Sequence, residues 1–149
     1  MALVSNGTYQ FRDQDNIGYL VIRDPAPGSP VVVSRDGLLP PVWQIKNEDD
    51  GTVTIWTEFK GRRMYLSCAG DPRVAAPLVY GMEPRRWDLR PGTDEDYVVI
   101  AVPARLLGPG DKDGLAVDLP QADAYPPPAV LERLSPEKDT QNWFLQEQS

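Results

Sequence analysis

Three short stretches of alternating apolar and polar residues recur along the chain at a constant interval. They begin at Tyr9, Val53 and Tyr97, so each lies 44 residues after the one before it. A second landmark, a tryptophan that opens another short strand-like stretch, recurs at Trp43 and Trp87, again 44 residues apart. An interval shared by two independent landmarks indicates an internal structural repeat.

The third copy of this repeat is longer than the other two. Its closing tryptophan, Trp143, lies 56 residues after Trp87, which amounts to an insertion of 12 residues. Alternation of apolar and polar side chains is typical of half-buried strands, and each copy reads as four of them. Three such units around an axis can share one core and pair most strand edges. We therefore predict one all-β domain, a β-trefoil of three four-strand repeats at about residues 7–47, 51–91 and 95–147.

The size and charge of the chain narrow its possible partners. Its 149 residues suit a single domain, and its net charge of −7 repels phosphate backbones and anionic lipid. We therefore expect neither nucleic acid nor a membrane as a partner. No apolar run approaches the roughly 20 residues of a membrane span, and the first residues do not resemble a secretion signal. With a single cysteine in addition, we expect a cytoplasmic protein. No sequence feature indicates a dimer face, so we expect a monomer.

The sequence lacks the residues on which many catalytic sites depend. It contains no histidine, which removes Ser-His-Asp and Cys-His arrangements and histidine-ligated metals. One cysteine cannot form a thiolate zinc cluster, and there is no Gly-rich phosphate-binding loop of the P-loop type. We therefore expect no enzyme activity, no cofactor and no metal, but a binding function carried by loops on a rigid scaffold.

Four segments carry a resemblance to a known family. They are Gly7-Thr8-Tyr9-Gln10-Phe11-Arg12, Pro30-Val31-Val32-Val33, Leu39-Pro40-Pro41-Val42-Trp43-Gln44-Ile45 and Trp143-Phe144-Leu145, the last preceded by a proline-rich stretch. With these segments the chain resembles the mushroom β-trefoil protease inhibitors of the cospin and cnispin type. The resemblance implies a fungal inhibitor whose partner is a trypsin-like serine protease, bound through an exposed rigid loop.

The same resemblance implies two candidate loops. In the cospin-type pattern the protease-binding residue lies between the second and third strands, which here places Arg23, followed by Asp24 and Pro25, in the reactive loop. Arginine suits a specificity pocket lined by aspartate, and nearby prolines lower the entropy lost on binding. The cnispin-type pattern uses a lysine between the last two strands, which here implies Lys138, followed by Asp139.

Simpler interpretations of these residues stay open. Arg23 can be the end of a strand before a proline turn, and Lys138 can belong to an ordinary charged loop. A third basic segment, residues 60–63, is expected in a hairpin of the second repeat and is a weaker candidate.

Two other binding functions also stay open. The clitocypin-type cysteine protease inhibitors share the scaffold and use loops that correspond to residues 13–16 and 34–39, although their glycine pair and their legumain-binding asparagine have no match here. Ricin-B-type lectins carry a glutamine two residues before the tryptophan of each repeat. Only Gln141-Asn142-Trp143 follows that pattern, and we interpret the tryptophans as core residues.

Overall fold

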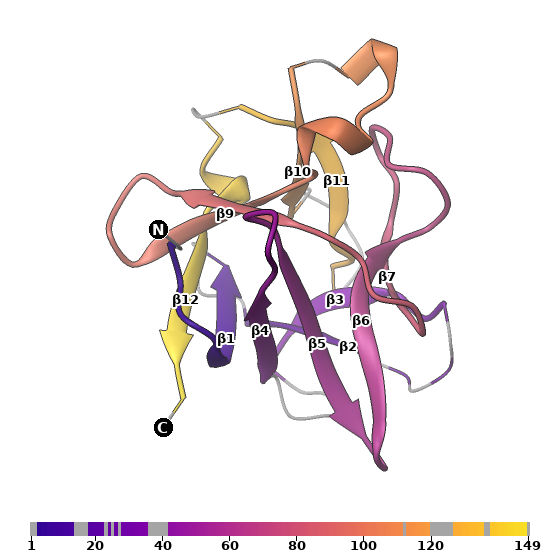
Figure 1. Ribbon diagram of the computed structural model, residues 1–149, viewed down its shortest axis with the longest axis vertical. Coiled ribbons are helices and arrows are strands. Elements are labelled where there is room, and N and C mark those ends of the chain that lie inside the picture. The colour runs from indigo at the N-terminus through magenta and orange to yellow at the C-terminus, as the bar shows by residue number, and fades with distance from the viewer. Residues whose placement is uncertain are drawn as a thin grey trace.

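The computed structural model describes residues 3–13, 18–22, 24, 26, 28–35, 42–111, 113–119, 127–135 and 138–148 (Figure 1). The first repeat consists of β1 (Gly7–Asp13), β2 (Tyr19–Ile22), β3 (Val31–Ser34) and β4 (Trp43–Asn47). The second consists of β5 (Val53–Phe59), β6 (Arg62–Cys68), β7 (Leu78–Gly81) and β8 (Asp88–Pro91). The third consists of β9 (Tyr97–Ala101), β10 (Leu115–Asp118), β11 (Val130–Arg133) and β12 (Trp143–Glu147), with short 3-10 helices η1 (Ala104–Leu106), η2 (Pro109–Asp111) and η3 (Asp139–Gln141).

The first and last strands of each repeat form a closed ring. Backbone pairing runs from β12 through β1 and β4 to β5, and from β12 through β9 to β8. The ring closes where Val53 and Trp87 exchange two backbone hydrogen bonds of 2.8 Å each. Each of these strands therefore has a neighbour on both sides, which removes the open edges that promote aggregation.

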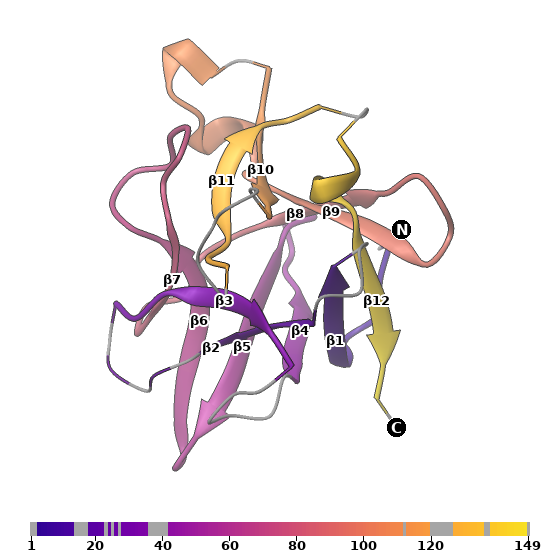
Figure 2. The ribbon, with the colours of Figure 1, turned by 180° about the vertical axis from the view of Figure 1, so that it is seen from behind.

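The two inner strands of each repeat form a hairpin, and the three hairpins meet one another (Figure 2). Isolated bridges join them in pairs: Pro30 to Val79, Pro77 to Val130, and Val32 to Pro128. A proline takes part in every joint. Because proline has no N–H group, it limits pairing to a short bridge at the point where two hairpins meet.

A tryptophan from each repeat anchors the core. Trp43, Trp87 and Trp143 are at most 1% exposed. Each indole Nε1 donates to a carbonyl oxygen on the second strand of its own repeat: Trp43 to Leu20 at 2.9 Å, Trp87 to Leu66 at 2.9 Å and Trp143 to Val117 at 3.1 Å. The interpretation of these tryptophans as core residues is confirmed, and the recurrence of one contact shows that the three repeats are equivalent.

These features define a β-trefoil, and the predicted fold class is confirmed. Part of the additional length of the third repeat lies between β9 and β10, where η1 and η2 occur (Figure 1). Within the described ranges, no helix is long and apolar enough to cross a membrane.

Candidate functional site

In each repeat, one carbonyl group on the second strand accepts the hydrogen bond from the tryptophan indole. The residue that follows this carbonyl group differs between the three repeats. It is Val21 in the first repeat, Ser67 in the second and Asp118 in the third, and all three are buried. In the second repeat, Nη1 of Arg85 donates to Oγ of Ser67 at 3.3 Å. In the third, Nε2 of Gln141 donates to Oδ2 of Asp118 at 3.1 Å. Arg85 and Gln141 both stand two residues before the tryptophan of their repeat, so the two contacts are equivalent. Only the contact in the third repeat contains a carboxylate.

Asp118 lies almost entirely inside the protein. Its side chain is 1% exposed, and Nζ of Lys138 lies 2.7 Å from Oδ2. The other oxygen, Oδ1, is buried and has no hydrogen-bond partner among the described residues. A buried carboxylate is costly to desolvate unless it is paired, so Lys138 and Gln141 together offset the burial of Asp118.

Gln141 is held in one orientation by its own contacts. It is 1% exposed, its Oε1 accepts a hydrogen bond of 3.0 Å from the backbone N–H of Ser135, and its Nε2 also donates to the carbonyl of Arg133 at 2.7 Å. The side chain therefore links η3, the end of β11 and Asp118. This fixed amide positions the segment that forms one wall of the neighbouring pocket.

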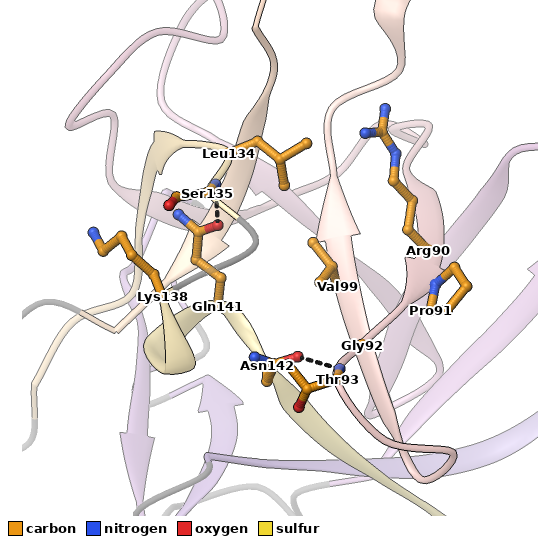
Figure 3. A pocket seen from close by; sticks show the side chains of 10 residues that line it. All are labelled: Arg90, Pro91, Gly92, Thr93, Val99, Leu134, Ser135, Lys138, Gln141 and Asn142. Atoms are coloured by element: carbon orange, nitrogen blue, oxygen red, sulfur yellow. Dashed lines mark hydrogen bonds between the residues drawn. The ribbon is translucent and has the colours of Figure 1, made fainter.

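A pocket of about 470 Å³ lies beside this cluster (Figure 3). Its lining comes from two walls, the β8–β9 region and the segment that leads to β12: Arg90, Pro91, Gly92, Thr93 and Val99 on the first, and Leu134, Ser135, Lys138, Gln141 and Asn142 on the second. Most ligand sites for small molecules fall between about 300 and 1,000 Å³, so a small ligand fits here.

One hydrogen bond holds the two walls of the pocket together. Oδ1 of Asn142 accepts a hydrogen bond of 3.0 Å from the backbone N–H of Thr93, which joins one wall to the other. Gly92 allows this close approach, because a Cβ atom there would lie 2.6 Å from that same Oδ1. On the first wall, Nε of Arg90 donates to Oδ2 of Asp88 at 3.0 Å.

The loop implied by the cospin-type resemblance is only partly described. Arg23 and Pro25 lie outside the described residues, whereas Asp24 is exposed. The end of this loop is attached to the second repeat: the N–H of Gly28 donates to the carbonyl of Tyr80, and the N–H of Tyr80 donates to the carbonyl of Ser29, both at 3.1 Å.

The second predicted loop forms part of the pocket. Lys138 precedes η3 and is ion-paired with Asp118, and Asp139 is the exposed first residue of η3. The third basic segment forms a tight hairpin between β5 and β6, in which Lys60 and Gly61 adopt positive φ angles of 52° and 75°. The clitocypin-type loops fall mostly outside the described ranges.

In the sequence, Gln141 was noted only as the single match to the Gln-x-Trp pattern, and neither its partner Asp118 nor Arg90 on the opposite wall was predicted. A detectable signal was present, because the one Gln-x-Trp motif lies 23 residues after an aspartate that ends an apolar strand. Among the residues that the structure describes, no three His, Cys, Asp or Glu side chains are grouped to hold a metal ion.

Comparison with known proteins supports the fold. No family model matches the sequence, and no curated protein matches it. Among solved structures, the Macrolepiota procera ricin B-like lectin in complex with lactose aligns with 99% of this chain and 100% of its own, at 20% identity and a TM-score of 0.74. The Rhizoctonia solani agglutinin aligns over 97% of both chains at 16% identity and a TM-score of 0.77. A mosquitocidal holotoxin aligns with 98% of this chain at 15% identity and a TM-score of 0.76, but this chain spans only 18% of the toxin. These likenesses establish the β-trefoil fold.

Proposed function

We propose that this protein is a non-catalytic, glycan-binding β-trefoil whose ligand occupies the pocket between β8 and the third repeat. The observation that carries the proposal is the buried carboxylate of Asp118, which binds Gln141 and Lys138 of the pocket lining. The fold does not require this carboxylate, because the equivalent position is Ser67 in the second repeat and Val21 in the first. A buried carboxylate that the fold does not need is better explained by a ligand site than by stability.

The lining of the pocket suits a sugar. A sugar ring has apolar C–H faces and a rim of hydroxyl groups. Val99, Leu134 and Pro91 supply apolar surface, while Ser135 and Thr93 supply hydroxyl groups. The volume accommodates one or two sugar rings.

The structural neighbours add support at the level of the scaffold. Two of the solved structures quoted above are a lectin and an agglutinin, and one of them was solved with lactose. The pocket of this chain has no aromatic side chain among the ten residues that line it, so a ring-stacking contribution is missing. We therefore expect weak binding, with dissociation constants of about 1 mM for single sugars.

A glycan array followed by NMR titration of the labelled protein tests this function. Sugar binding should shift the amide signals of Thr93, Ser135 and Asn142, and the variant Gln141→Leu should lose these shifts. The matched control is Arg85→Leu, which alters the equivalent position of the second repeat and should leave them intact. If no glycan on the array binds and no sugar shifts these amides, the glycan-binding function is wrong.

Inhibition of a trypsin-like serine protease is a second candidate, and one observation favours it. The loop after β2 is held against β7 by the two backbone hydrogen bonds between Tyr80 and the segment 28–29. A loop fixed at its base loses less entropy when a protease binds it. The resemblance to the mushroom inhibitors assigns Arg23 to this loop, whereas Lys138 would have to leave Asp118 to enter a protease pocket.

Assays of trypsin, papain and legumain with the purified protein test inhibition. In this second proposal trypsin is inhibited, and Arg23→Ala abolishes inhibition while Lys138→Ala does not. Equal inhibition by the Arg23→Ala protein would place the reactive residue elsewhere, and inhibition of papain or legumain alone would favour the clitocypin-type function. Full activity of all three enzymes at micromolar protein would rule out the inhibitor function.

A further inference from the structure

We propose that the pocket between β8 and the third repeat selects sugars that carry a carboxylate group. This inference rests on the glycan-binding function proposed above and adds the chemical class of the ligand. It follows from the balance of hydrogen-bond donors and acceptors in the pocket lining: some already bind other groups of the protein, and others remain for a ligand (Figure 3).

The side-chain oxygens of the lining amides each accept one hydrogen bond inside the protein, which leaves one lone pair on each. Oε1 of Gln141 accepts from the backbone N–H of Ser135 at 3.0 Å, and Oδ1 of Asn142 accepts from the backbone N–H of Thr93 at 3.0 Å. None of the ten lining residues is acidic. The side-chain acceptors that remain for a ligand in this lining are therefore hydroxyl groups and the second lone pair of each amide oxygen, all of them neutral.

The donors, in contrast, remain in excess. Arg90 uses Nε to bind Asp88, and its two Nη groups have no partner among the described residues. Lys138 carries three N–H groups and directs Nζ toward Asp118, which leaves donors for a ligand. The side chains of Arg90 and Lys138 are 38% and 46% exposed, so both can be reached from solvent.

Both cations are fixed in place by carboxylates, and the lining contains no other charged side chain. Figure 3 shows Arg90 and Lys138 on opposite walls of the pocket. Each cation is already paired with a carboxylate, Arg90 with Asp88 and Lys138 with Asp118, so each wall offers a ligand its remaining N–H donors rather than a free positive charge. A carboxylate accepts several hydrogen bonds and pairs well with a guanidinium group, whereas the CH2OH group of a neutral sugar does neither as strongly. The site therefore favours a uronic acid over the matching neutral sugar.

NMR titration with two matched pairs of sugars tests this selectivity: glucuronic acid against glucose, and galacturonic acid against galactose. Within each pair the sugars differ only in the carboxylate. We expect at least one of the two acids to bind about tenfold more tightly than its neutral partner, as a charge-assisted hydrogen bond predicts. The shifts should occur at the amides of Thr93, Ser135 and Asn142, and added salt should weaken acid binding.

The variant Arg90→Gln should reduce the preference for the acid to about twofold or less, because it removes one of the two cations. The control is Arg63→Gln, which changes an exposed arginine outside the pocket that pairs with Glu58 and should keep the full preference. Thermal unfolding of both variants checks that the fold is intact.

The outcomes separate the two proposals. Equal binding of acid and neutral sugars, or a preference that Arg90→Gln does not change, overturns the acidic selectivity and leaves the glycan-binding function standing. Shifts of the same size with acetate as with the uronic acids indicate a carboxylate site without sugar recognition and overturn the selectivity for acidic sugars. Absence of shifts with all four sugars, together with a blank glycan array, overturns both proposals.

Discussion

Nε2 of Gln141 donates a hydrogen bond of 3.1 Å to Oδ2 of Asp118, which connects the only Gln-x-Trp motif of the chain to the end of β10. The same amide binds the backbone of Arg133 and Ser135, so one side chain joins three segments of the third repeat. The equivalent contact in the second repeat, from Arg85 to Ser67, involves neutral Ser67 in place of a carboxylate. This difference between two otherwise matching positions locates the candidate site.

Replacing Gln141 with Leu should lower the free energy of unfolding by about 2–3 kcal/mol, because the buried carboxylate of Asp118 and the part-buried N–H of Ser135 each lose a partner. Arg85→Leu should cost less than about 1 kcal/mol, because its contact is partly exposed and Ser67 is neutral. Urea denaturation of both variants measures the difference. Equal losses would show that Gln141 contributes no more than its counterpart in the second repeat.

The three indole anchors should be energetically similar. Trp87→Phe and Trp143→Phe each remove a buried N–H···O bond and part of a buried ring, and each should cost about 2 kcal/mol. Trp56→Phe is the control, because its Nε1 is buried and has no hydrogen-bond partner among the described residues. That change removes an unpaired donor and should cost less than about 1 kcal/mol. A cost for Trp56→Phe as large as for the other two would contradict the role of the N–H contact.

Asp50 makes the stability of the protein sensitive to acid. Hydrogen bonds from the side chain and backbone of Thr52, and then from Arg105, hold the pKa of Asp50 well below its ordinary value of 3.8. A carboxyl group with a lowered pKa stabilises the folded state above its unfolded pKa, and this contribution is lost as the pH falls through the folded value. Asp50→Asn should therefore be less stable than the native protein at neutral pH.

The stability difference between the two proteins should begin to narrow as the pH falls below about 4, where Asp50 takes up a proton in the unfolded chain, and it should keep narrowing toward the lowered pKa of Asp50 in the folded protein. Thermal unfolding midpoints across this range test the prediction. Arg105→Gln, which removes one of the contacts, should show a smaller effect in the same direction. A constant difference between native protein and Asp50→Asn at every pH would assign the effect to packing.

The turn between β5 and β6 depends on glycine for its backbone conformation. Gly61 has a φ angle of 75°, and a Cβ atom added there meets nothing within 4 Å, so a substitution changes only the backbone energy. Gly61→Ala should destabilise the protein by about 1 kcal/mol. Gly110 also has open space around its Cβ position but no positive φ, so Gly110→Ala should be neutral to within about 0.5 kcal/mol. Denaturant titrations of both variants measure the difference.

The fold could be predicted from the sequence because each repeat can be recognised from patterns of residues that lie close together in the chain. The alternating strands that begin near Tyr9, Val53 and Tyr97 and the tryptophans at 43, 87 and 143 each depend on residues close together in the chain. A strand that buries one face must alternate apolar and polar residues. Repeats that are structurally equivalent must place their corresponding residues at a constant spacing along the chain. These constraints leave the β-trefoil as the common solution.

The candidate site depended on the tertiary structure. Asp118 and Gln141 belong to different segments, and they meet because β10 and β12 both pair with β9, which brings the end of β10 beside η3. No local pattern encodes that approach or the ion pair that ties Lys138 to Asp118. The sequence by itself determined three equivalent repeats around a tryptophan core, because short-range periodicity is sufficient for strands and their burial. Only the tertiary structure decided which repeat carries the buried carboxylate and where the pocket forms, because contacts between side chains far apart in sequence depend on strand register and loop conformation.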